Sequence, residues 1–503
     1  MTTKDQRIGA NRVGRDRRHP GWPRRLSHWL PTLLVLALVG SAFAAHRFEW
    51  GPRYLGWPGG EPVDEPAAVA PPEGLELPAW ASPRPVATPP VSPVSPASPA
   101  TVEATVVEAT LAAGLRDKTL GKHVVAAVGD LRGNGAAWTY NDDQFIPAST
   151  TKLLTSAAAL AALGPDHRFT TTVVRGGGPR ELVLVGGGDP YLASKAASPE
   201  EESTTYPARA DIVTLARATA RELTGRKPVR VVYDDSIFAG PSNNPKWRAD
   251  YVPDDIVSPI TGLWVDRGAS PTGYGRSDDP SLTAAATFAS ALAKAGVKVA
   301  GTPTPGLAAP DAPLLASVDS APVAQIVERV LEVSDNEAAE VLARHVGIAV
   351  TSDGSFLGGA SGVMSTLQAL GIDTGADVVH DGSGLSRANR LSAATLVRVL
   401  QVAADPLHPE LRALITSLPV AGFTGSLANR FAAAGVGALG DVRAKTGTLS
   451  GVSSLAGVAV GRDGTQLVFV LAADKTGNAR ESEVEAAVDQ LAADLAVCRC
   501  GSG

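Results

Sequence analysis

The chain is poor in cysteine and in metal-binding patterns. Its two cysteines, Cys498 and Cys500, are separated by one residue, a spacing too tight for an easy intramolecular disulfide. We therefore expect no disulfide to hold the fold, and we expect the end of the chain, 498–503, to be an exposed tail. The eight histidines form no H-E-x-x-H motif and no set with paired cysteines, so nothing indicates a metal or another cofactor.

A strong excess of charge of one sign is also missing. The formal net charge is only -6 over 503 residues, and the body of the chain has no basic patch that would indicate a nucleic-acid partner. With 44% hydrophobic and 19% charged residues the composition is that of a globular protein, and the length suffices for two or three domains.

The N-terminus departs from this balance. Residues 1–28 are rich in arginine and precede the apolar run 29–45, WLPTLLVLALVGSAFAA. A basic segment before an apolar run predicts an export signal whose flank stays in the cytoplasm. The run has about 17 residues, the lower limit for crossing a bilayer, so a membrane anchor and a cleaved signal peptide both remain open. A buried core helix fits the flanks poorly. We expect an exported protein of the cell envelope, on the extracytoplasmic face, with the membrane as a partner through 29–45.

A linker follows this run. Residues 46–101 include PRPVATPP and VSPVSPASP, which are dense in proline, alanine, valine and serine. Such a composition buries too little apolar surface to fold and favours extended polyproline II. It fits a semi-stiff spacer that holds a domain away from a membrane, and equally a linker with no spacing role.

Folded sequence begins near Val102 with an amphipathic helix. Alternating apolar residues around Gly133-Asn134-Gly135 predict a hairpin, and three further strands lie near the end of the chain. We expect these segments to join in one antiparallel sheet, so that the catalytic domain, 102–168 and 315–497, is discontinuous. The expected strands are 123–131, 136–140, 441–448, 453–460 and 465–471.

Helices are expected around this sheet. An alanine- and leucine-rich run predicts a long buried helix that begins at about Ser149. Further helical periodicity lies at 323–345, 393–404 and 481–495. Between these parts, 169–314 alternates β-branched pieces with glycine- and proline-rich turns and two helical stretches, 212–223 and 281–295. This pattern indicates one or two inserted small α+β domains.

Three short motifs stand in order along the chain. They are the S-x-x-K of Ser149 and Lys152, Ser334-Asp335-Asn336, and Lys445-Thr446-Gly447, the set found in β-lactamases and penicillin-binding proteins. Each alone has an ordinary explanation: a helix cap followed by a surface lysine, a capping turn, and an edge strand with a solvated lysine. Together they predict a serine acyl-transfer site.

The chemistry assigns a role to each motif residue. At a helix N-terminus Ser149 can act as the nucleophile, and Lys152, one turn later, can take its proton if desolvation and nearby positive charge lower the lysine pKa. Ser334 can pass a proton to the leaving amine, and the Asn336 amide can bind a substrate carbonyl. The strand supplies fixed positive charge from Lys445.

The remaining groups on that strand bind substrate. The Thr446 hydroxyl can bind a substrate carboxylate, and Gly447 removes a side chain where a substrate approaches the backbone. The backbone N–H groups of Ser149 and Thr448 form the natural oxyanion hole, worth about 3–4 kcal/mol per donor.

Over about 102–495 the chain resembles the low-molecular-mass class C penicillin-binding proteins, the D-alanyl-D-alanine carboxypeptidase/endopeptidase family. Beyond the three motifs the resemblance rests on LVLVGGGDP at 182–190, DDSIF at 234–238 and DGSGLSR at 381–387. The long separation of the first two motifs also matches a large insertion in that family and exceeds the short separation in class A β-lactamases.

The resemblance implies an α+β fold, with a β-lactamase/penicillin-binding-protein-like catalytic domain whose antiparallel five-stranded sheet lies between helices. It implies peptidoglycan stem peptides as substrates, ending in D-Ala-D-Ala or cross-linked through diaminopimelate, and β-lactam antibiotics as inhibitors that acylate the serine. In family members an acid of the inserted region can face the diamino-acid side chain, and Asp234 is the residue matched to it here, with an ordinary turn aspartate as the alternative.

Two other functions share these motifs. A class A β-lactamase would carry an E-x-x-L-N sequence after Ser334-Asp335-Asn336, and none follows. A catalytically silent wall-binding protein would not need all five of the residues Ser149, Lys152, Ser334, Asn336 and Lys445 intact. Carboxypeptidase and endopeptidase action are left open.

Overall fold

The computed structural model describes residues 101–502 except 225, 226, 433 and 435, and these residues belong to one compact unit. The expected segments 1–28 and 29–45, and the linker 46–101 except its last residue, lie outside the described residues. Among the helices of 101–502, none is both long enough and apolar enough to cross a membrane.

The first sheet joins the two ends of the folded sequence. Its strand order is β2-β1-β10-β9-β8, and every neighbouring pair is antiparallel. The predicted five-stranded sheet is thereby confirmed. Its strands are β1 (Val124–Asp130), β2 (Trp138–Tyr140), β8 (Val442–Leu449), β9 (Val452–Val460) and β10 (Gln466–Ala473).

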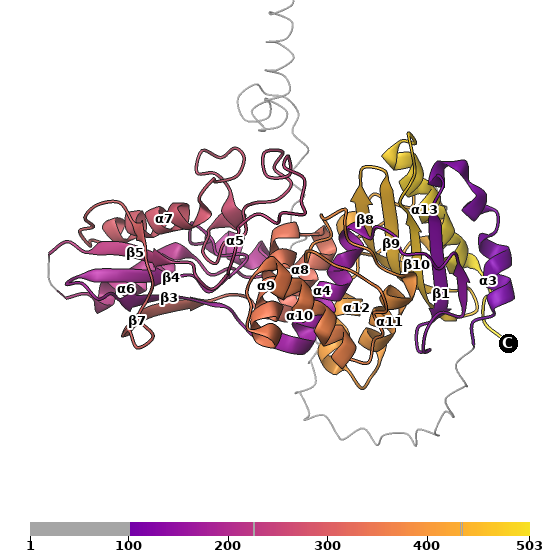
Figure 1. Ribbon diagram of the computed structural model, residues 1–503, viewed down its shortest axis with the longest axis horizontal. Helices are drawn as coiled ribbons and strands as arrows, with labels where there is room; N and C mark the ends of the chain where they lie inside the picture. The colour runs from indigo at the N-terminus through magenta and orange to yellow at the C-terminus, as the bar shows by residue number, and fades with distance from the viewer. Residues whose placement is uncertain (1–100, 225–226, 433, 435, 503) are drawn as a thin grey trace, which may run out of the picture. The chain divides into compact units, whose positions relative to one another are not determined.

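Helices cover both faces of this sheet because its strands are apolar on both sides. In β1, Val125 and Ala127 belong to one buried cluster, whereas Ala126 and Val128 belong to the other. This is the two-residue alternation of a strand. Figure 1 shows α3 (Ala104–Leu111) and α13 (Glu481–Val497) on one face of the sheet and α4 (Lys152–Leu163) and α11 (Ala393–Ala404) on the other.

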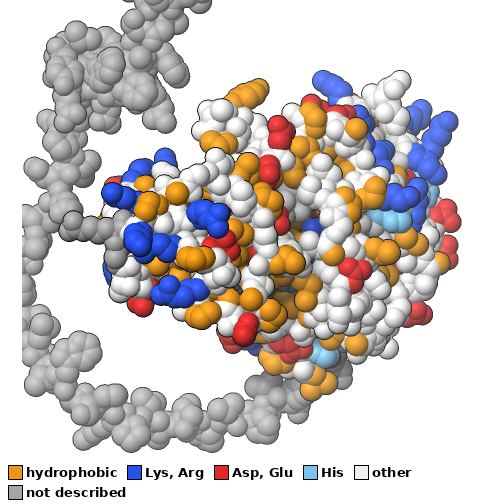
Figure 2. All heavy atoms as spheres, turned by 60° about the vertical axis from the view of Figure 1, so that its left-hand side comes forward, with side chains coloured by type: hydrophobic (Ala, Val, Ile, Leu, Met, Phe, Trp, Pro, Cys, Tyr) orange, Lys and Arg blue, Asp and Glu red, His pale blue; other side chains and the backbone are white. Residues whose placement is uncertain are grey.

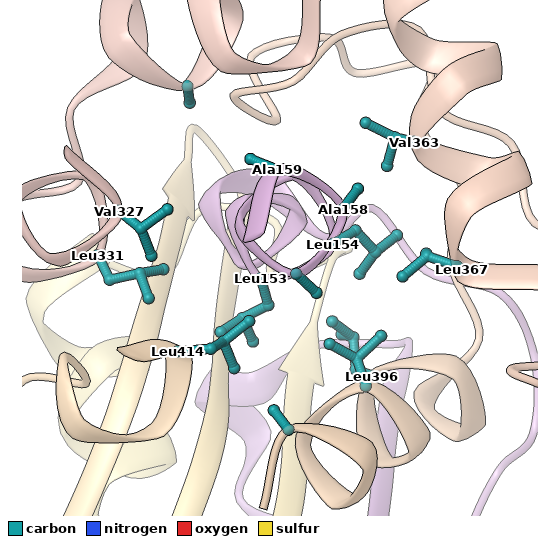
Figure 3. Close-up of a cluster of buried hydrophobic side chains, with 14 of the residues drawn as sticks. Leu153, Leu154, Ala158, Ala159, Val327, Leu331, Val363, Leu367, Leu396 and Leu414 are labelled. Carbon is teal, nitrogen blue, oxygen red and sulfur yellow. The ribbon is translucent and has the colours of Figure 1, made fainter. Parts of the chain in front are cut away.

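Helix α4 lies at the centre of the larger cluster. Figure 3 looks along it, with Leu153, Leu154, Ala158 and Ala159 directed outward into side chains from its neighbours. Full burial of each leucine is worth about 1.5–3 kcal/mol, so packing fixes both the position and the rotation of α4. The neighbours are α8 (Val323–Val333), α9 (Asn336–Thr351), α10 (Phe356–Ala369), α11 and α12 (Arg412–Thr416).

Helix α10 was not predicted, because three glycines interrupt its helical pattern. Glycine disfavours an isolated helix by about 1 kcal/mol. Here a Cβ on Gly359 would lie 2.9 Å from the Ala343 carbonyl oxygen, and one on Gly362 would lie 3.0 Å from Gly347. The glycines thus allow α9 and α10 to pack backbone against backbone.

The inserted region forms a second, mixed sheet in the order β6-β5-β4-β3-β7. Its β4–β5 and β5–β6 pairs are parallel, while β3 pairs antiparallel with β4 and β7. Helices α6 (Ile212–Glu222) and α7 (Pro280–Lys294) contribute to its apolar core, and a short α5 (Pro199–Thr204) precedes them. The strands are β3 (Thr170–Arg175), β4 (Glu181–Val185), β5 (Arg230–Asp234), β6 (Thr304–Pro305) and β7 (Leu314–Asp319).

This layer confirms the predicted inserted α+β part of the fold. Strand β7 continues to Asp319, beyond the expected end of the insertion at 314, because it pairs with β3.

Figure 2 shows Lys and Arg side chains in several separate groups on the face it presents, with Asp and Glu side chains between them.

The C-terminal end differs from the expectation. Cys498 and Cys500 form a disulfide, with their Cα atoms 5.4 Å apart, within the usual range. Both are buried, and the Cys500 carbonyl accepts the Glu103 N–H at 2.8 Å. The C-x-C spacing thus does form a disulfide, against the expectation, and the prediction of an exposed tail was wrong, because the end of the chain packs beside its folded beginning.

Candidate active site

Ser149 stands on a tight turn directly before α4. The turn is a 3₁₀ helix, Ala148–Thr151, and α4 begins only at Lys152, three residues later than expected for the start of the long helix. Ala148 has φ 48°, a left-handed conformation that is costly for a residue with a side chain. Such a conformation persists only where the surroundings impose it.

Two glycines let other segments close on this turn. A Cβ on Gly384 would lie 1.8 Å from the Ala148 carbonyl oxygen, and one on Gly447 would lie 2.6 Å from the Pro147 carbonyl oxygen. The missing side chain of Gly447 therefore makes room for the nucleophile turn, while the approach of a substrate at Gly447 stays a prediction. Ser454 Oγ, which donates to the Pro147 carbonyl at 2.7 Å, ties the same turn to the sheet.

Lys152 lies fully buried beside Ser149. Its Nζ is 2.9 Å from Ser149 Oγ, 2.8 Å from Asn336 Oδ1 and 2.7 Å from the Ser383 carbonyl oxygen. Burial lowers the pKa of Lys152 to about 8, against the opposing effect of nearby carboxylates, Glu340 first among them. A neutral amine, able to accept a proton from the serine, is thereby accessible near neutral pH.

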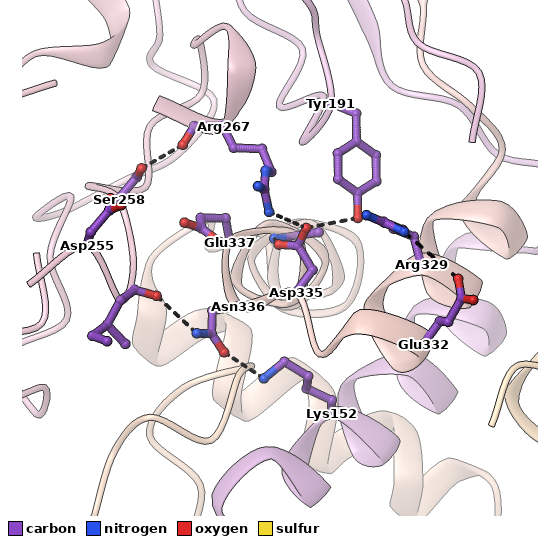
Figure 4. Close-up of polar contacts among 12 residues, drawn as sticks. Lys152, Tyr191, Asp255, Ser258, Arg267, Arg329, Glu332, Asp335, Asn336 and Glu337 are labelled. Atoms are coloured by element: carbon purple, nitrogen blue, oxygen red, sulfur yellow. Dashed lines mark hydrogen bonds and ion pairs between the residues drawn. The ribbon is translucent and has the colours of Figure 1, made fainter. Parts of the chain in front are cut away.

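The Ser334-Asp335-Asn336 motif divides the expected helical stretch 323–345 into two helices, α8 and α9. Helix α8 ends at Val333 and is followed by its C-cap Ser334, which is left-handed with φ 60°, and Asp335 caps α9 by accepting the Ala338 N–H at 3.0 Å. Asn336 then faces Lys152 (Figure 4). Its Nδ2 donates to the Ile256 carbonyl at 3.1 Å, which fixes which end of the amide faces the lysine.

Strand β8 carries the third motif at the edge of the sheet. Lys445 is fully buried, and its Nζ donates to the Thr446 carbonyl at 2.9 Å. Burial, together with the Lys152 cation, lowers the pKa of Lys445 well below its usual value. These surroundings oppose the fixed charge expected of Lys445, and a negatively charged group placed against it would raise that pKa again.

The Thr446 and Thr448 hydroxyl groups both have hydrogen-bond partners within the chain. Thr446 Oγ1 lies 2.9 Å from Ser426 Oγ, and Thr448 Oγ1 donates to Glu485 Oε1 at 3.1 Å. The Ala444 N–H donates to the Pro419 carbonyl, away from β9. Because strand N–H groups alternate in direction, the Thr448 N–H also points away from β9 and is directed as an oxyanion donor would need.

Asp234 is not brought to these residues. It ends β5, and its two carboxylate oxygens accept the Ser236 N–H at 3.0 Å and the Ala308 N–H at 2.8 Å. The side chain closes a turn of the second sheet and is mostly buried. The prediction that Asp234 faces a substrate therefore has no support in its contacts.

Comparison with known proteins identifies the family. A family model described as "D-Ala-D-Ala carboxypeptidase 3 (S13) family" matches residues 107–274 and 269–495. The chain belongs to this family. The predicted family and enzyme class, a serine D-Ala-D-Ala carboxypeptidase, are thereby confirmed.

Similar proteins agree with this assignment. Carboxypeptidase Rv3627c of Mycobacterium tuberculosis is 38% identical over 408 residues, 80% of this chain and 86% of that protein. Carboxypeptidase DacB of Mycolicibacterium smegmatis is 36% identical over 362 residues, 71% of this chain and 76% of its own length. The crystal structure of penicillin binding protein 4 (dacB) from Haemophilus influenzae has the same fold, with a TM-score of 0.63 at 22% identity over 77% of this chain and 98% of that one.

Two residues that support the carboxypeptidase site were missed from the sequence. Ser383 supplies a carbonyl to Lys152, and the buried Glu340 accepts the N–H groups of Gly382 at 3.1 Å and Ser383 at 2.7 Å. Burial raises the pKa of Glu340 to about 8, with Asp381 adding to the effect. The available signal for Glu340 was its place on the polar face of α9, three and four residues from Glu337, Asn336 and Arg344.

Proposed function

We propose that this carboxypeptidase removes the terminal D-alanine from peptidoglycan stem peptides through an acyl-enzyme on Ser149. One observation carries the proposal: the Nζ of the fully buried Lys152 lies 2.9 Å from Ser149 Oγ. This is the nucleophile and base arrangement that a serine acyl transfer needs. Asn336 and Ser383 hold Lys152 in place from two other directions.

In the first step neutral Lys152 takes the Ser149 proton as Oγ bonds to the carbonyl carbon of the penultimate D-alanine. The N–H groups of Ser149 and Thr448 stabilise the resulting oxyanion. Ser334 relays the proton held by Lys152 to the leaving amine, the peptide bond breaks, D-alanine departs and Lys152 is neutral again. Lys152 then takes a proton from water as the water attacks the ester, and this proton returns to Ser149 Oγ when the ester bond breaks.

Substrate binding uses the groups around the nucleophile. The Asn336 amide has two hydrogens, so one can bind the Ile256 carbonyl while the other binds a substrate carbonyl. The terminal carboxylate of D-Ala-D-Ala lies against Lys445 and Thr446. Its negative charge raises the pKa of Lys445, so the charge of the lysine and the bound carboxylate support each other.

The same reaction on a β-lactam ring leaves an acylated serine. A structure of the Haemophilus influenzae protein of the same fold is described as complexed with a β-lactam, with a TM-score of 0.58. An enzyme that acts on these substrates works in the cell envelope, so it has to be exported. Residues 29–45 would serve either as its membrane anchor or as a signal peptide that is cleaved off. Endopeptidase action on cross-links is compatible with this site chemistry.

Labelling with fluorescent penicillin tests the proposal. We expect the purified protein to take up one label, on the peptide that contains Ser149, and to release D-alanine from a pentapeptide ending in D-Ala-D-Ala. Ser149→Ala is expected to abolish both activities while it stays folded. Label on another residue, or D-alanine release by Ser149→Ala, would rule the assignment out.

A further inference from the structure

A segment of the inserted region, 255–276, contacts the loop that carries Ser334 and Asn336. The contacts fall on three consecutive residues, Asp335, Asn336 and Glu337. Each contact comes from a different residue of the segment. The inserted region thus contacts Asp335, which lies between Ser334 and Asn336, as well as Asn336 itself and the residue after it.

The first contact is an ion pair with a buried partner. Arg267 Nη1 lies 2.9 Å from Asp335 Oδ2, and the Asp335 side chain is 1% exposed. The Tyr191 hydroxyl donates to the same oxygen at 3.3 Å, while Oδ1 caps α9 (Figure 4). Both oxygens of the carboxylate are therefore engaged, which leaves it one position.

Arg267 is itself held firmly. Its backbone is left-handed, with φ 57°, and its carbonyl accepts Ser258 Oγ at 2.6 Å and Arg276 Nη1 at 3.4 Å. A non-glycine residue adopts this conformation only where its surroundings impose it. The guanidinium is thus presented from a fixed backbone position.

The second and third contacts lie on the following residues. Arg276 Nη2 is 2.8 Å from Glu337 Oε1, and Arg276 also pairs with Asp255. The Ile256 carbonyl accepts Asn336 Nδ2 at 3.1 Å, opposite the oxygen that faces Lys152. The segment therefore holds the motif with two arginines, and its Ile256 carbonyl orients the Asn336 amide toward Lys152.

We propose that Arg267 and Arg276 are positioning residues for acylation, which hold Asp335 and Glu337 so that Ser334 and Asn336 face the nucleophile. The inference rests on the proposed acyl-enzyme at Ser149. It assigns the inserted region a part in the chemistry, although none of the three motifs lies within that region. Neither arginine touches the reacting atoms in this role.

The test compares substitutions at Arg267 with a matched arginine. We expect Arg267→Ala to lower the plateau rate constant for acylation by penicillin about tenfold to a hundredfold, the range for a displaced catalytic group. Arg267→Lys should recover most of the rate, because only one guanidinium nitrogen contacts Asp335. Arg248→Ala removes an exposed ion pair with Asp250 of the same region and is expected to leave the rate unchanged.

A second variant separates positioning from stability. Arg267→Ala leaves a buried carboxylate unpaired, so Arg267→Ala combined with Asp335→Asn removes the charge while keeping a good helix cap. A double variant with recovered thermal stability but a low acylation rate supports the proposal. Recovery of both, or an Arg267→Ala protein that acylates at the parent rate, overturns it. Failure of the parent protein to label at Ser149 would instead contradict the proposed function.

Discussion

The Nζ of Lys152 lies 2.9 Å from Ser149 Oγ, and both residues are held by segments far apart in the chain. Asn336 and Ser383 fix the lysine, while Gly384 and Gly447 allow two segments to pack against the nucleophile turn. The short S-x-x-K spacing brings the two side chains together, but the burial of the lysine away from solvent depends on the long-range contacts.

Lys152→Arg is expected to lose almost all acylation. A guanidinium supplies positive charge but cannot give up a proton in a protein, so the general base is lost, at about 10²- to 10⁴-fold in rate. Stopped-flow measurement with a fluorescent penicillin gives the rate constant directly. The exposed Lys122→Arg serves as the matched control and should behave as the parent. Acylation of Lys152→Arg at the parent rate would mean that another group is the base.

The acylation rate should depend on pH through Lys152. Its pKa is lowered to about 8, and the neutral amine is the active form. The rate is therefore expected to rise about tenfold per pH unit well below 8 and to level off above it. A profile of the acylation rate constant between pH 5.5 and 9.5, on protein shown to stay folded, measures the midpoint. A rate that still rises about tenfold per pH unit at pH 9.5, as for a base with the ordinary lysine value of 10.5, would contradict a desolvated base.

Much of the fold could be predicted because it follows from local pattern. The strands of the first sheet consist of alternating or continuous apolar residues. In the motif at Ser334, polar residues of the kind that cap helices stand between two apolar helical stretches. The match of Asp234 to a substrate-facing acid rests on its sequence neighbours and stays a prediction without structural support, because its carboxylate accepts the backbone N–H groups of Ser236 and Ala308. The Arg267–Asp335 pair could not be predicted, since nothing in the local sequence of either residue indicates the other.

Glu340→Gln is expected to weaken both stability and acylation. Glu340 accepts two backbone N–H groups, but a glutamine side chain has one oxygen and would place an NH₂ group against a second donor. An unsatisfied buried donor costs about 1–3 kcal/mol, and the Ser383 carbonyl would move away from Lys152. The free energy of unfolding measured with urea and the acylation rate should both be lower than in the parent protein. The exposed Glu222→Gln serves as the control and should change neither. An unchanged acylation rate would show that Glu340 has only a structural role.

Gly384→Ala tests how the nucleophile turn is held, and the chain offers a close control. Gly384 and Gly464 have φ values of 87° and 81°, so an alanine at either position adds a similar left-handed strain, about 1–2 kcal/mol. Their surroundings differ: nothing lies within 4 Å of a Cβ on Gly464, whereas a Cβ on Gly384 would lie 1.8 Å from the Ala148 carbonyl oxygen. Gly464→Ala should therefore lower the melting temperature slightly and keep its acylation rate.

Gly384→Ala, in contrast, has to displace the turn that carries Ser149. We expect its acylation rate to fall about a hundredfold or more, because a shift of the nucleophile by about 1 Å can cost that much. The melting temperature reports the common strain, and the difference between the two variants in acylation rate reports the contact with Ala148. Equal behaviour of the two alanine variants would mean that the 381–387 segment moves aside freely and does not hold the turn.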